Sequence, residues 1–281
     1  MATKNKIGVM EGRLLPKYQG RYQAHPVGYW QDEFSVAKQL GLDCIELILD
    51  YNNAKQNPLL KDGGIDELQA VIEKTGVAVY TVCADYFMEA PLHSTDSTIA
   101  DQSQKVMLKL LENSSKLGVT DVVVPCVDQS TLDGQETADR FVERMKPMVA
   151  AAEELGVNLS LETDLSPQPF VDLLDRFDSD RVTVNYDIGN SAASGFNPQE
   201  EFAAYGPRIV NVHVKDRLLG GTTVPLGAGS ANFDTVFAAL AQINYQGNFI
   251  LQTARAADGN HADSLCIFHD MTINWLKHYA T

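Results

Sequence analysis

The chain alternates short β-branched segments with amphipathic helical segments from end to end. Four of the first five helix-to-strand junctions share one pattern, in which a glycine ends the helix and a strand follows at once: LGLDCIEL, TGVAVYTV, LGVTDVVV and LGVNLSLE. Eight such units in 281 residues average about 35 residues each, which is the unit size of a closed (β/α)8 barrel. We therefore predict a protein of the α/β class with a single TIM-barrel domain over residues 1–281.

Hydrophobic periodicity places eight strands and eight helices in this frame. The expected strands are 6–10, 43–48, 77–83, 119–125, 157–162, 181–187, 208–213 and 247–252. The expected helices are 29–40, 65–74, 99–117, 137–155, 169–177, 198–205, 232–243 and 262–278, the seventh with Asn232 as its cap. An open doubly wound sheet is the alternative, but it would normally carry a GxGxxG loop after the first strand, where this chain reads EGRLLP.

The charge balance narrows the range of partners. The chain has 22 Lys and Arg residues against 37 Asp and Glu residues, for a formal net charge of −15. Such an acidic protein is poorly suited to nucleic acid or anionic membranes, which both favour basic surfaces. The four cysteines show no CxxC spacing, and no apolar run approaches the roughly 20 residues of a membrane helix. We expect a cytoplasmic protein without nucleic-acid or membrane partners, and we leave open a homo-oligomer.

Four polar side chains stand at the ends of consecutive expected strands. Glu162, Asp187, His213 and Gln252 end the fifth to eighth strands, and each follows an apolar run. Active sites of TIM barrels lie at the C-terminal ends of the strands, so we expect these side chains to meet there. Any one of them alone could merely cap a helix, but two carboxylates, an imidazole and an amide oxygen together suit a divalent metal. We predict one such ion, Mn²⁺, Co²⁺, Mg²⁺ or Zn²⁺, held by these four residues.

The segments around these residues carry motifs that resemble a known family. DIGN stands at 187–190, HVKD at 213–216 and PLGAG at 225–229. With Glu162 upstream, this order is similar to that of the sugar (phosphate) isomerase/epimerase superfamily with the xylose-isomerase-like TIM barrel, especially its ribulose-phosphate and ketose 3-epimerases. The similarity runs over nearly the whole chain. It implies one divalent metal that chelates adjacent oxygens of an open-chain sugar, with Glu162, Asp187 and His213 as ligands and Glu162 as a proton-transfer residue.

Two positions depart from the family pattern. Where the related epimerases place a second Glu on the last strand this chain has Gln252, and where many members read PLGEG it reads PLGAG. A glutamine amide ligates a metal through its oxygen but cannot act as a general base. Epimerisation normally calls for a base on each face of the reacting carbon, whereas aldose–ketose isomerisation through an enediol can use one. The residues therefore leave isomerisation and epimerisation both open.

We expect an enzyme, namely a metal-dependent isomerase or epimerase of a small sugar, sugar phosphate or sugar derivative that acts through an enediolate. A lyase or dehydratase is an alternative, because removal of a proton beside a carbonyl also begins a β-elimination. A non-catalytic sugar-binding protein is suggested by Gln252 alone. An abasic-site endonuclease of the same barrel superfamily would need further metal-binding histidines and a basic DNA face, and here Asn190 stands where a histidine would be wanted.

Further candidate residues flank the expected strand ends. Lys215 follows His213 by two residues, on the same side of a continuing strand, and is a candidate for proton transfer beside Glu162. The candidate substrate-binding residues are Arg13, Glu46, Asn190, Arg217 and Arg255. Of these, Glu46 follows from the resemblance, as a contact of a sugar hydroxyl or of another site residue. The backbone N–H groups of Gly227, Gly229 and Ser230 are candidates to bind a phosphate or carboxylate.

Overall fold

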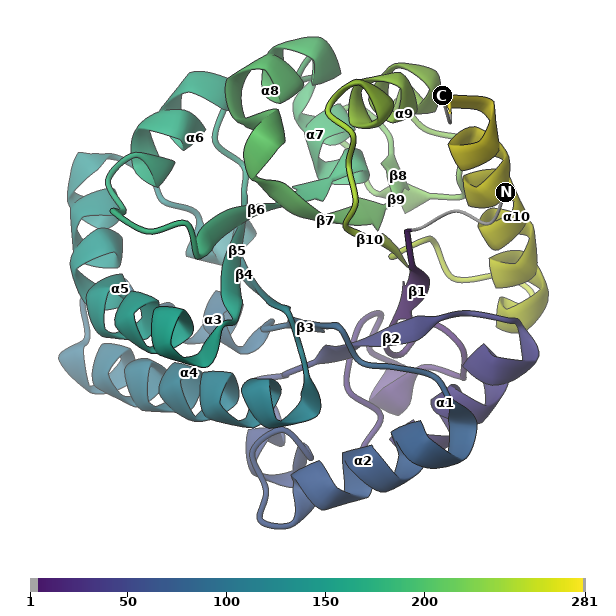
Figure 1. Cartoon of the computed structure of the whole chain (residues 1–281), viewed down its shortest axis with the longest axis horizontal. Coiled ribbons are helices and arrows are strands. Elements are labelled where there is room, and N and C mark those ends of the chain that lie inside the picture. The colour runs from purple at the N-terminus through teal and green to yellow at the C-terminus, as the bar shows by residue number, and fades with distance from the viewer. Residues whose placement is uncertain (1–4, 280–281) are drawn as a thin grey trace.

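A closed ring of parallel strands is surrounded by helices in the computed structural model of the chain, which describes residues 5–279 (Figure 1). The strands follow the order β1-β10-β7-β6-β5-β4-β3-β2, and β1 pairs with both β10 and β2, which closes the barrel. The predicted (β/α)8 barrel is confirmed. Residues 1–4 and 280–281 of the single domain predicted over 1–281 lie outside the described residues.

The main elements lie close to the segments predicted for them. The barrel strands are β1 (Ile7–Met10), β2 (Cys44–Ile48), β3 (Thr81–Cys83), β4 (Asp121–Cys126), β5 (Asn158–Thr163), β6 (Val182–Asp187), β7 (Ile209–Val214) and β10 (Asn248–Leu251). The helices that alternate with them are α1 (Trp30–Gln39), α2 (Gly64–Thr75), α4 (Ser97–Leu117), α5 (Gln135–Leu155), α6 (Pro167–Leu174), α8 (Pro198–Tyr205), α9 (Phe233–Gln242) and α10 (His261–Tyr279).

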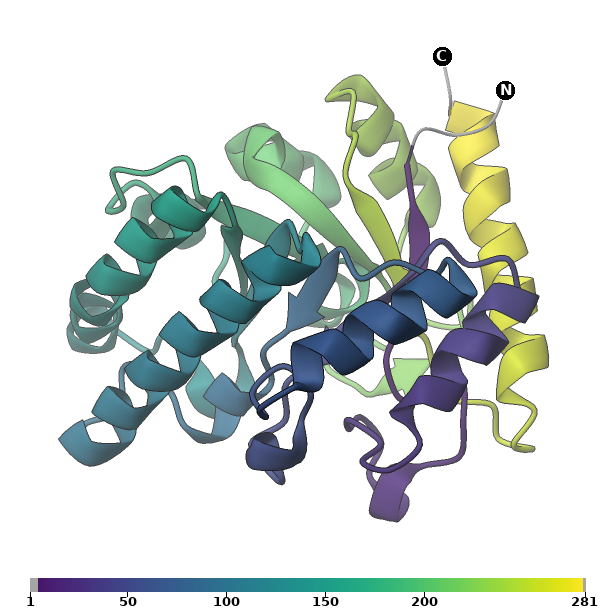
Figure 2. The same cartoon turned by 60° about the horizontal axis from the view of Figure 1, so that its bottom comes forward.

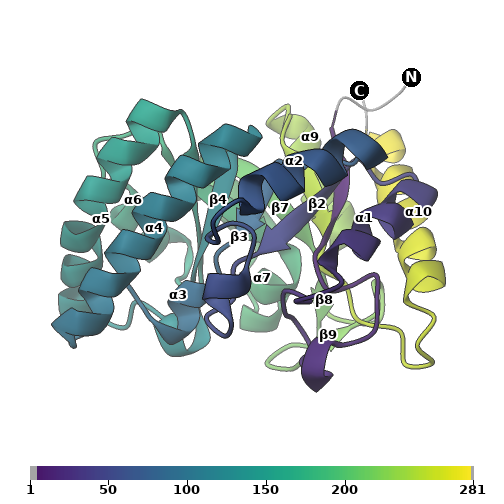
Figure 3. The ribbon, with the colours of Figure 1, turned by 90° about the horizontal axis from the view of Figure 1, so that it is seen from below.

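Short elements that the periodicity did not predict lie between these units. They include α3 (Tyr86–Glu89), α7 (Ile188–Ser194), and the two-stranded hairpin of β8 (Asp216–Arg217) with β9 (Thr223–Val224). Elements of two to seven residues are too short to show a hydrophobic period. Figure 3 shows the β8–β9 hairpin and the loop between β1 and α1 at the same end of the barrel.

Glycines and capping side chains set the ends of the helices. Gly118 and Gly156 end α4 and α5 with φ of 77° and 70°, a left-handed conformation that side chains with a Cβ rarely adopt. At the start of α9 the Asn232 side chain accepts a hydrogen bond from the backbone N–H of Thr235, which confirms its predicted capping role. The helices can therefore stop close to the next strand and return the chain to the barrel.

The inside of the barrel has an apolar half and a polar half. A separate cluster of buried residues forms the apolar half: Met10, Cys44, Ile48, Cys83, Val123 and Ile250. Gly8 is required beside it, because a Cβ at that position would lie 2.4 Å from Sγ of Cys44. Strands β5, β6 and β7 instead turn polar side chains inward, which bond to one another and to Glu46 of β2. This polar half supports the candidate site.

The outer faces of the strands pack under the helices, as Figure 2 shows. Large buried aromatic side chains fill this layer, among them Phe34, Phe141, Phe237 and Phe249. Their burial supplies much of the hydrophobic stabilisation of the fold. Within residues 5–279, none of the helices combines the length and the apolar character needed to cross a bilayer.

Candidate active site

The ends of β5, β6 and β7 bring three of the predicted metal ligands together. One ligand atom each of Glu162, Asp187 and His213 lies within 4.8 Å of the other two, and all three side chains are buried. Nδ1 of His213 is 3.2 Å from Oε2 of Glu162 and 3.8 Å from Oδ2 of Asp187. The parallel register pairs Asp187 with His213, so the neighbouring strands present these groups at one height. Two carboxylates and an imidazole at this spacing suit a divalent cation.

The imidazole of His213 is held from behind by Glu46. Nε2 of His213 is 2.8 Å from Oε1 of Glu46, and Nδ2 of Asn211 donates to the other oxygen of that carboxylate at 3.0 Å. A proton on Nε2 satisfies this contact and leaves Nδ1 facing Glu162 and Asp187. Burial alone would lower the pKa of His213, but the Glu46 carboxylate and the neighbouring Asp187 and Glu162 raise it well above its ordinary value. The surrounding carboxylates thus favour a positive charge at this point.

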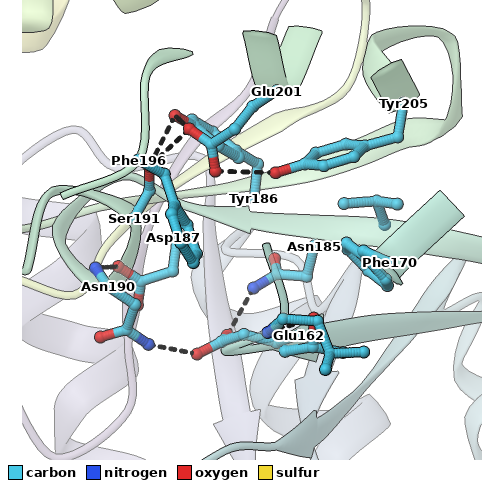
Figure 4. Close-up of a pocket in the computed structure, with 13 residues that line it drawn as sticks. Glu162, Phe170, Asn185, Tyr186, Asp187, Asn190, Ser191, Phe196, Glu201 and Tyr205 are labelled. Atoms are coloured by element: carbon cyan, nitrogen blue, oxygen red, sulfur yellow. Dashed lines mark hydrogen bonds between the residues drawn. The ribbon is translucent and has the colours of Figure 1, made fainter. Parts of the chain in front are cut away.

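Both oxygens of Glu162 are oriented by asparagine side chains, as Figure 4 shows. Nδ2 of Asn185 donates to Oε2 of Glu162 at 2.6 Å, and Nδ2 of Asn190 donates to Oε1 at 2.8 Å. Asn190 also donates its backbone N–H to Oδ1 of Asp187, at the start of α7. The predicted substrate-binding Asn190 therefore connects the two carboxylates of the cluster.

Lys215 lies beside this cluster. Its Nζ is 3.0 Å from Oδ2 of Asp187 and 3.0 Å from Oδ1 of Asn190. Burial would raise the pKa of Asp187, but the Lys215 ammonium group lowers it to about 2. The stem of Lys215 passes directly over Gly189 of the DIGN motif, where a Cβ would lie 2.6 Å from Cγ of the lysine. The glycine of this motif thus makes room for the lysine.

A second buried network anchors the helices behind the site (Figure 4). The hydroxyls of Tyr186 and Tyr205 both donate to the carboxylate of Glu201, at 2.9 and 2.8 Å. Ser191 of α7 donates to the same carboxylate. These bonds tie α7 to α8 and to β6, and so hold Asn190 in place.

An open cavity of about 530 Å³ adjoins the cluster and reaches Glu162. Its size is within the range of sites for small molecules. Five further residues predicted for the site line it, namely Arg13, Asn190, Lys215, Arg217 and Gln252. Arg13 donates to Gln23, Tyr22 and Thr253, and burial lowers its pKa to about 10, so it remains a cation near neutrality. The cavity therefore offers both cationic and carboxylate groups to a polar ligand.

The two polar atoms of the Gln252 carboxamide differ in their hydrogen bonding. Its Nε2 donates to Oε1 of Gln23 at 3.3 Å, whereas its buried Oε1 has no hydrogen-bond partner among residues 5–279. A buried amide oxygen without a partner is costly, and a metal or a sugar hydroxyl would satisfy it. The acceptor character of this oxygen fits the predicted role of Gln252, and the assignment as fourth metal ligand stays a prediction.

Two residues predicted to bind substrate have other roles in the structure. Glu46 is fully buried behind His213, outside the lining of the cavity, so it contacts another site residue rather than a sugar hydroxyl. Arg255 donates to the carbonyl oxygens of Gly12 and Leu15, which fixes the loop after β1. Neither position could be told from a substrate contact by sequence, because both follow or lie within strands that lead to the site.

The predicted anion site before α9 is wrong. The N–H groups of Gly227 and Gly229 both donate to Oδ2 of Asp216 at 2.9 Å, and the N–H of Ser230 donates to the carbonyl of Arg217. A Cβ on Gly229 would lie 2.1 Å from Oδ1 of Asp216, so the glycine is needed for this close approach. Asp216 of the HVKD motif thus folds the PLGAG loop and uses the donors that an anion would need.

Residues of the site that were not predicted include Asn185, Gln23 and Asp85. Asn185 lies two residues before Asp187 and shares its face of β6, so strand alternation could have found it. Gln23 and Asp85 line the cavity from the loops after β1 and β3, where no periodic pattern exists. Nε2 of Gln23 donates to Oδ2 of Asp85 at 2.7 Å. The sequence does not show that such loop residues meet at the cavity, because only the closed barrel brings them together.

Known proteins are similar to this chain over most of its length. A putative L-ribulose-5-phosphate 3-epimerase of Haemophilus influenzae is 28% identical over 89% of this chain and 88% of its own length. An L-ribulose-5-phosphate 3-epimerase of Salmonella paratyphi C is 28% identical over 91% of this chain and 92% of its own length. The sequence similarity thus spans nearly the whole of each protein.

Solved structures share the fold at lower identity. An L-ribulose 3-epimerase superposes with a TM-score of 0.78 at 14% identity, covering 98% of this chain and 95% of the other. A D-psicose 3-epimerase of Clostridium cellulolyticum H10 superposes with a TM-score of 0.74 at 18% identity, covering 96% and 99%. Residues 34–266 match the family described as Xylose isomerase-like TIM barrel, and the chain belongs to that family.

Proposed function

We propose that this protein is a divalent-metal-dependent isomerase or epimerase of a small sugar, sugar phosphate or sugar derivative. The main support is the group of Glu162, Asp187 and His213, with ligand atoms within 4.8 Å, beside a cavity of about 530 Å³. The relatives named as ribulose-phosphate 3-epimerases, similar over nearly their full length, favour an open-chain ketose or its phosphate as substrate.

The residues of the site have separate proposed roles, in metal binding, proton transfer and hydrogen bonding to the substrate. Glu162, Asp187 and His213 would hold the metal, with Gln252 as a fourth, neutral ligand. When bound, a divalent ion supplies Lewis-acid chemistry, which stabilises negative charge on substrate oxygens. Glu162 lines the cavity and would take the proton from the carbon beside the carbonyl. Lys215 also lines the cavity and would donate a hydrogen bond to the oxygen on which charge develops.

Arg13, Lys215 and Arg217 are the cations at the cavity wall. Their charges offset the carboxylates there and favour a substrate with a phosphate or several hydroxyl groups. The formal charge of −15 and the free cysteines Cys44, Cys83, Cys126 and Cys266 support a cytoplasmic enzyme that acts on small carbohydrates rather than on nucleic acid or membranes.

Hydrogen exchange tests the proposal directly. Protein treated with a chelator and then reloaded with Mn²⁺ is incubated in D₂O with a panel of ketopentoses, ketohexoses and their phosphates, and the products are followed by NMR. We expect deuterium beside the carbonyl and a new isomer or epimer, only with metal. Exchange should disappear in Glu162→Gln for at least one epimer of the substrate.

Three other results would contradict the proposal. A dehydrated product would indicate a lyase. Saturable sugar binding without any exchange would indicate a sugar-binding protein. Full activity in chelated protein, with no divalent ion found by elemental analysis, would remove the metal from the reaction.

A further inference from the structure

Exchange of a proton on both faces of one carbon needs two groups that titrate. Glu162 supplies one of them, and Gln252 cannot supply the other, because an amide has no useful pKa. Among the described residues that line the cavity, two further carboxylic acids occur, Asp85 and Asp128. Asp128 is exposed to solvent, whereas Asp85 is partly buried directly after β3. Asp85 is therefore the carboxyl of the two that the cavity encloses.

Asp85 lies on a different wall of the cavity from the cluster. In the closed strand order, β3 is four places from β7, which puts it across the barrel from the strand that carries His213. Glu162 ends β5, two places from β3, so Asp85 and Glu162 line the cavity from two separate strands with β4 between them. The cavity thus offers a substrate two carboxyl groups from two different strands, and two-sided proton transfer needs two such groups.

The orientation of the Asp85 carboxyl is set by its neighbours. Nε2 of Gln23 donates to its Oδ2 at 2.7 Å, and Sγ of Cys83 donates to its Oδ1 at 3.2 Å. The Gln23 amide is itself oriented, because its Oε1 accepts from Arg13 at 2.6 Å and from Gln252 at 3.3 Å. A chain of hydrogen bonds thus runs from Gln252 through Gln23 to Asp85. The carboxyl is held in place as a catalytic group needs to be.

We propose that Asp85 is the second proton-transfer residue of this site and serves the face of the substrate carbon opposite Glu162. The proposal rests on the proposed function and favours epimerisation over one-base isomerisation. The Glu162 carboxylate takes the proton from one face, so the C–H bond breaks and its electron pair enters the enediolate. Protonated Asp85 then gives its proton to the same carbon from the other face, which forms the new C–H bond. Both carboxyls exchange protons with water before the next turnover.

The surroundings of Asp85 support this role. Burial raises its pKa to about 6, the hydrogen bonds from Gln23 and Cys83 oppose the rise, and the carboxylates of Asp50 and Glu162 add to it. Arg13 is the nearby cation. Near neutral pH both forms of the Asp85 carboxyl are then populated, so the group can act as an acid in one direction and as a base in the other.

The test separates the two faces. In Asp85→Asn, epimerisation should fall on the order of 100-fold or more. Exchange of deuterium into the epimer that Glu162 deprotonates should stay within a few-fold of wild type. Glu162→Gln should show the reverse, with exchange retained only in the other epimer. Asp133→Asn makes the same chemical change at an exposed position outside the cavity lining and should epimerise normally.

Two outcomes would overturn the role of Asp85. One is epimerisation by Asp85→Asn close to that of wild type; the other is a raised KM with unchanged kcat, which would make Asp85 a binding group. Either result would leave the proposed function intact, whereas no exchange by wild type with any ketose would contradict that function itself. If Asp85→Asn folds poorly, Asp85→Ser is used with added formate. Formate should restore part of the epimerisation to Asp85→Ser, and no restoration in the folded variant would count against the role.

Discussion

Nε2 of His213 lies 2.8 Å from Oε1 of Glu46, and both side chains are fully buried. This contact fixes which nitrogen of the imidazole faces Glu162 and Asp187. Partners of this kind typically contribute 10- to 100-fold to metal affinity. We therefore expect Glu46→Ala to weaken Mn²⁺ binding by about 10- to 100-fold, as measured by isothermal titration.

Glu46→Gln is the matched control for that effect. It keeps an oxygen that accepts a hydrogen bond from Nε2, although it removes the charge and the oxygen that accepts from Asn211, so its loss of affinity should be smaller than that of Glu46→Ala. Equal affinity of wild type and Glu46→Ala would show that Glu46 does not position the histidine.

Gln252 gives a second prediction about metal affinity. If its Oε1, which has no partner within residues 5–279, is a neutral ligand, Gln252→Glu adds a full negative charge to the cluster and should tighten Mn²⁺ binding. Gln252→Ala should weaken it. If the oxygen instead accepts a hydrogen bond from a sugar hydroxyl, titration will give the same Mn²⁺ affinity for both variants, and Gln252→Glu will raise KM for the substrate.

The close approach of Gly189 and Lys215 gives a third prediction. A Cβ at position 189 would lie 2.6 Å from Cγ of Lys215, so Gly189→Ala should displace the lysine from Asp187 and Asn190. Displacement of a catalytic group by about an ångström lowers the rate on the order of 100-fold, and we expect kcat to fall by up to that factor. Gly206→Ala is the control, because the nearest atom to a Cβ there is 3.5 Å away. Equal kcat in both variants would contradict a catalytic role for Lys215.

The fold could be predicted because its signals are local. Each strand is a short apolar run, and four of the helices are followed by a glycine, such as Gly118 or Gly156, whose positive φ the structure confirms. The start of β3 was less accurate: it begins at Thr81 rather than at residue 77, because before it only Ala78 bridges to Cys44. Periodicity shows that a segment is extended but not where its ladder begins.

The cluster of Glu162, Asp187 and His213 could be predicted because consecutive parallel strands end at one edge. The polar layer beneath it was not predicted but could have been, since Asn185 precedes Asp187 by two residues and Asn211 precedes His213 by two. The sequence did not show the role of every individual side chain. Asp216 accepts the N–H groups of the PLGAG loop, and no spacing in the sequence indicates that its side chain turns that way.

The last prediction concerns Glu33, a fully buried carboxyl outside the cavity. Its oxygens accept the backbone N–H groups of Gly12 and Leu15, at 2.6 and 3.3 Å, in the loop after β1. Burial raises its pKa from 4.5 to about 8, and the nearby Glu11 carboxylate adds to the rise. Between these two pH values the native state holds a proton that the unfolded chain has released. The free energy of unfolding should therefore fall as pH rises from about 5 to 8, by at most about 1.4 kcal/mol per pH unit from this group.

Glu33→Gln removes the titration while keeping an oxygen that accepts a hydrogen bond. Chemical denaturation at pH 5, 6, 7 and 8 should then show a flatter pH dependence of stability in Glu33→Gln than in wild type. Glu73→Gln, at an exposed position of α2, is the control and should keep the slope of wild type. A Glu33→Gln profile parallel to that of wild type would mean that Glu33 is ionised in the native protein, with its charge stabilised by the two N–H groups of the loop.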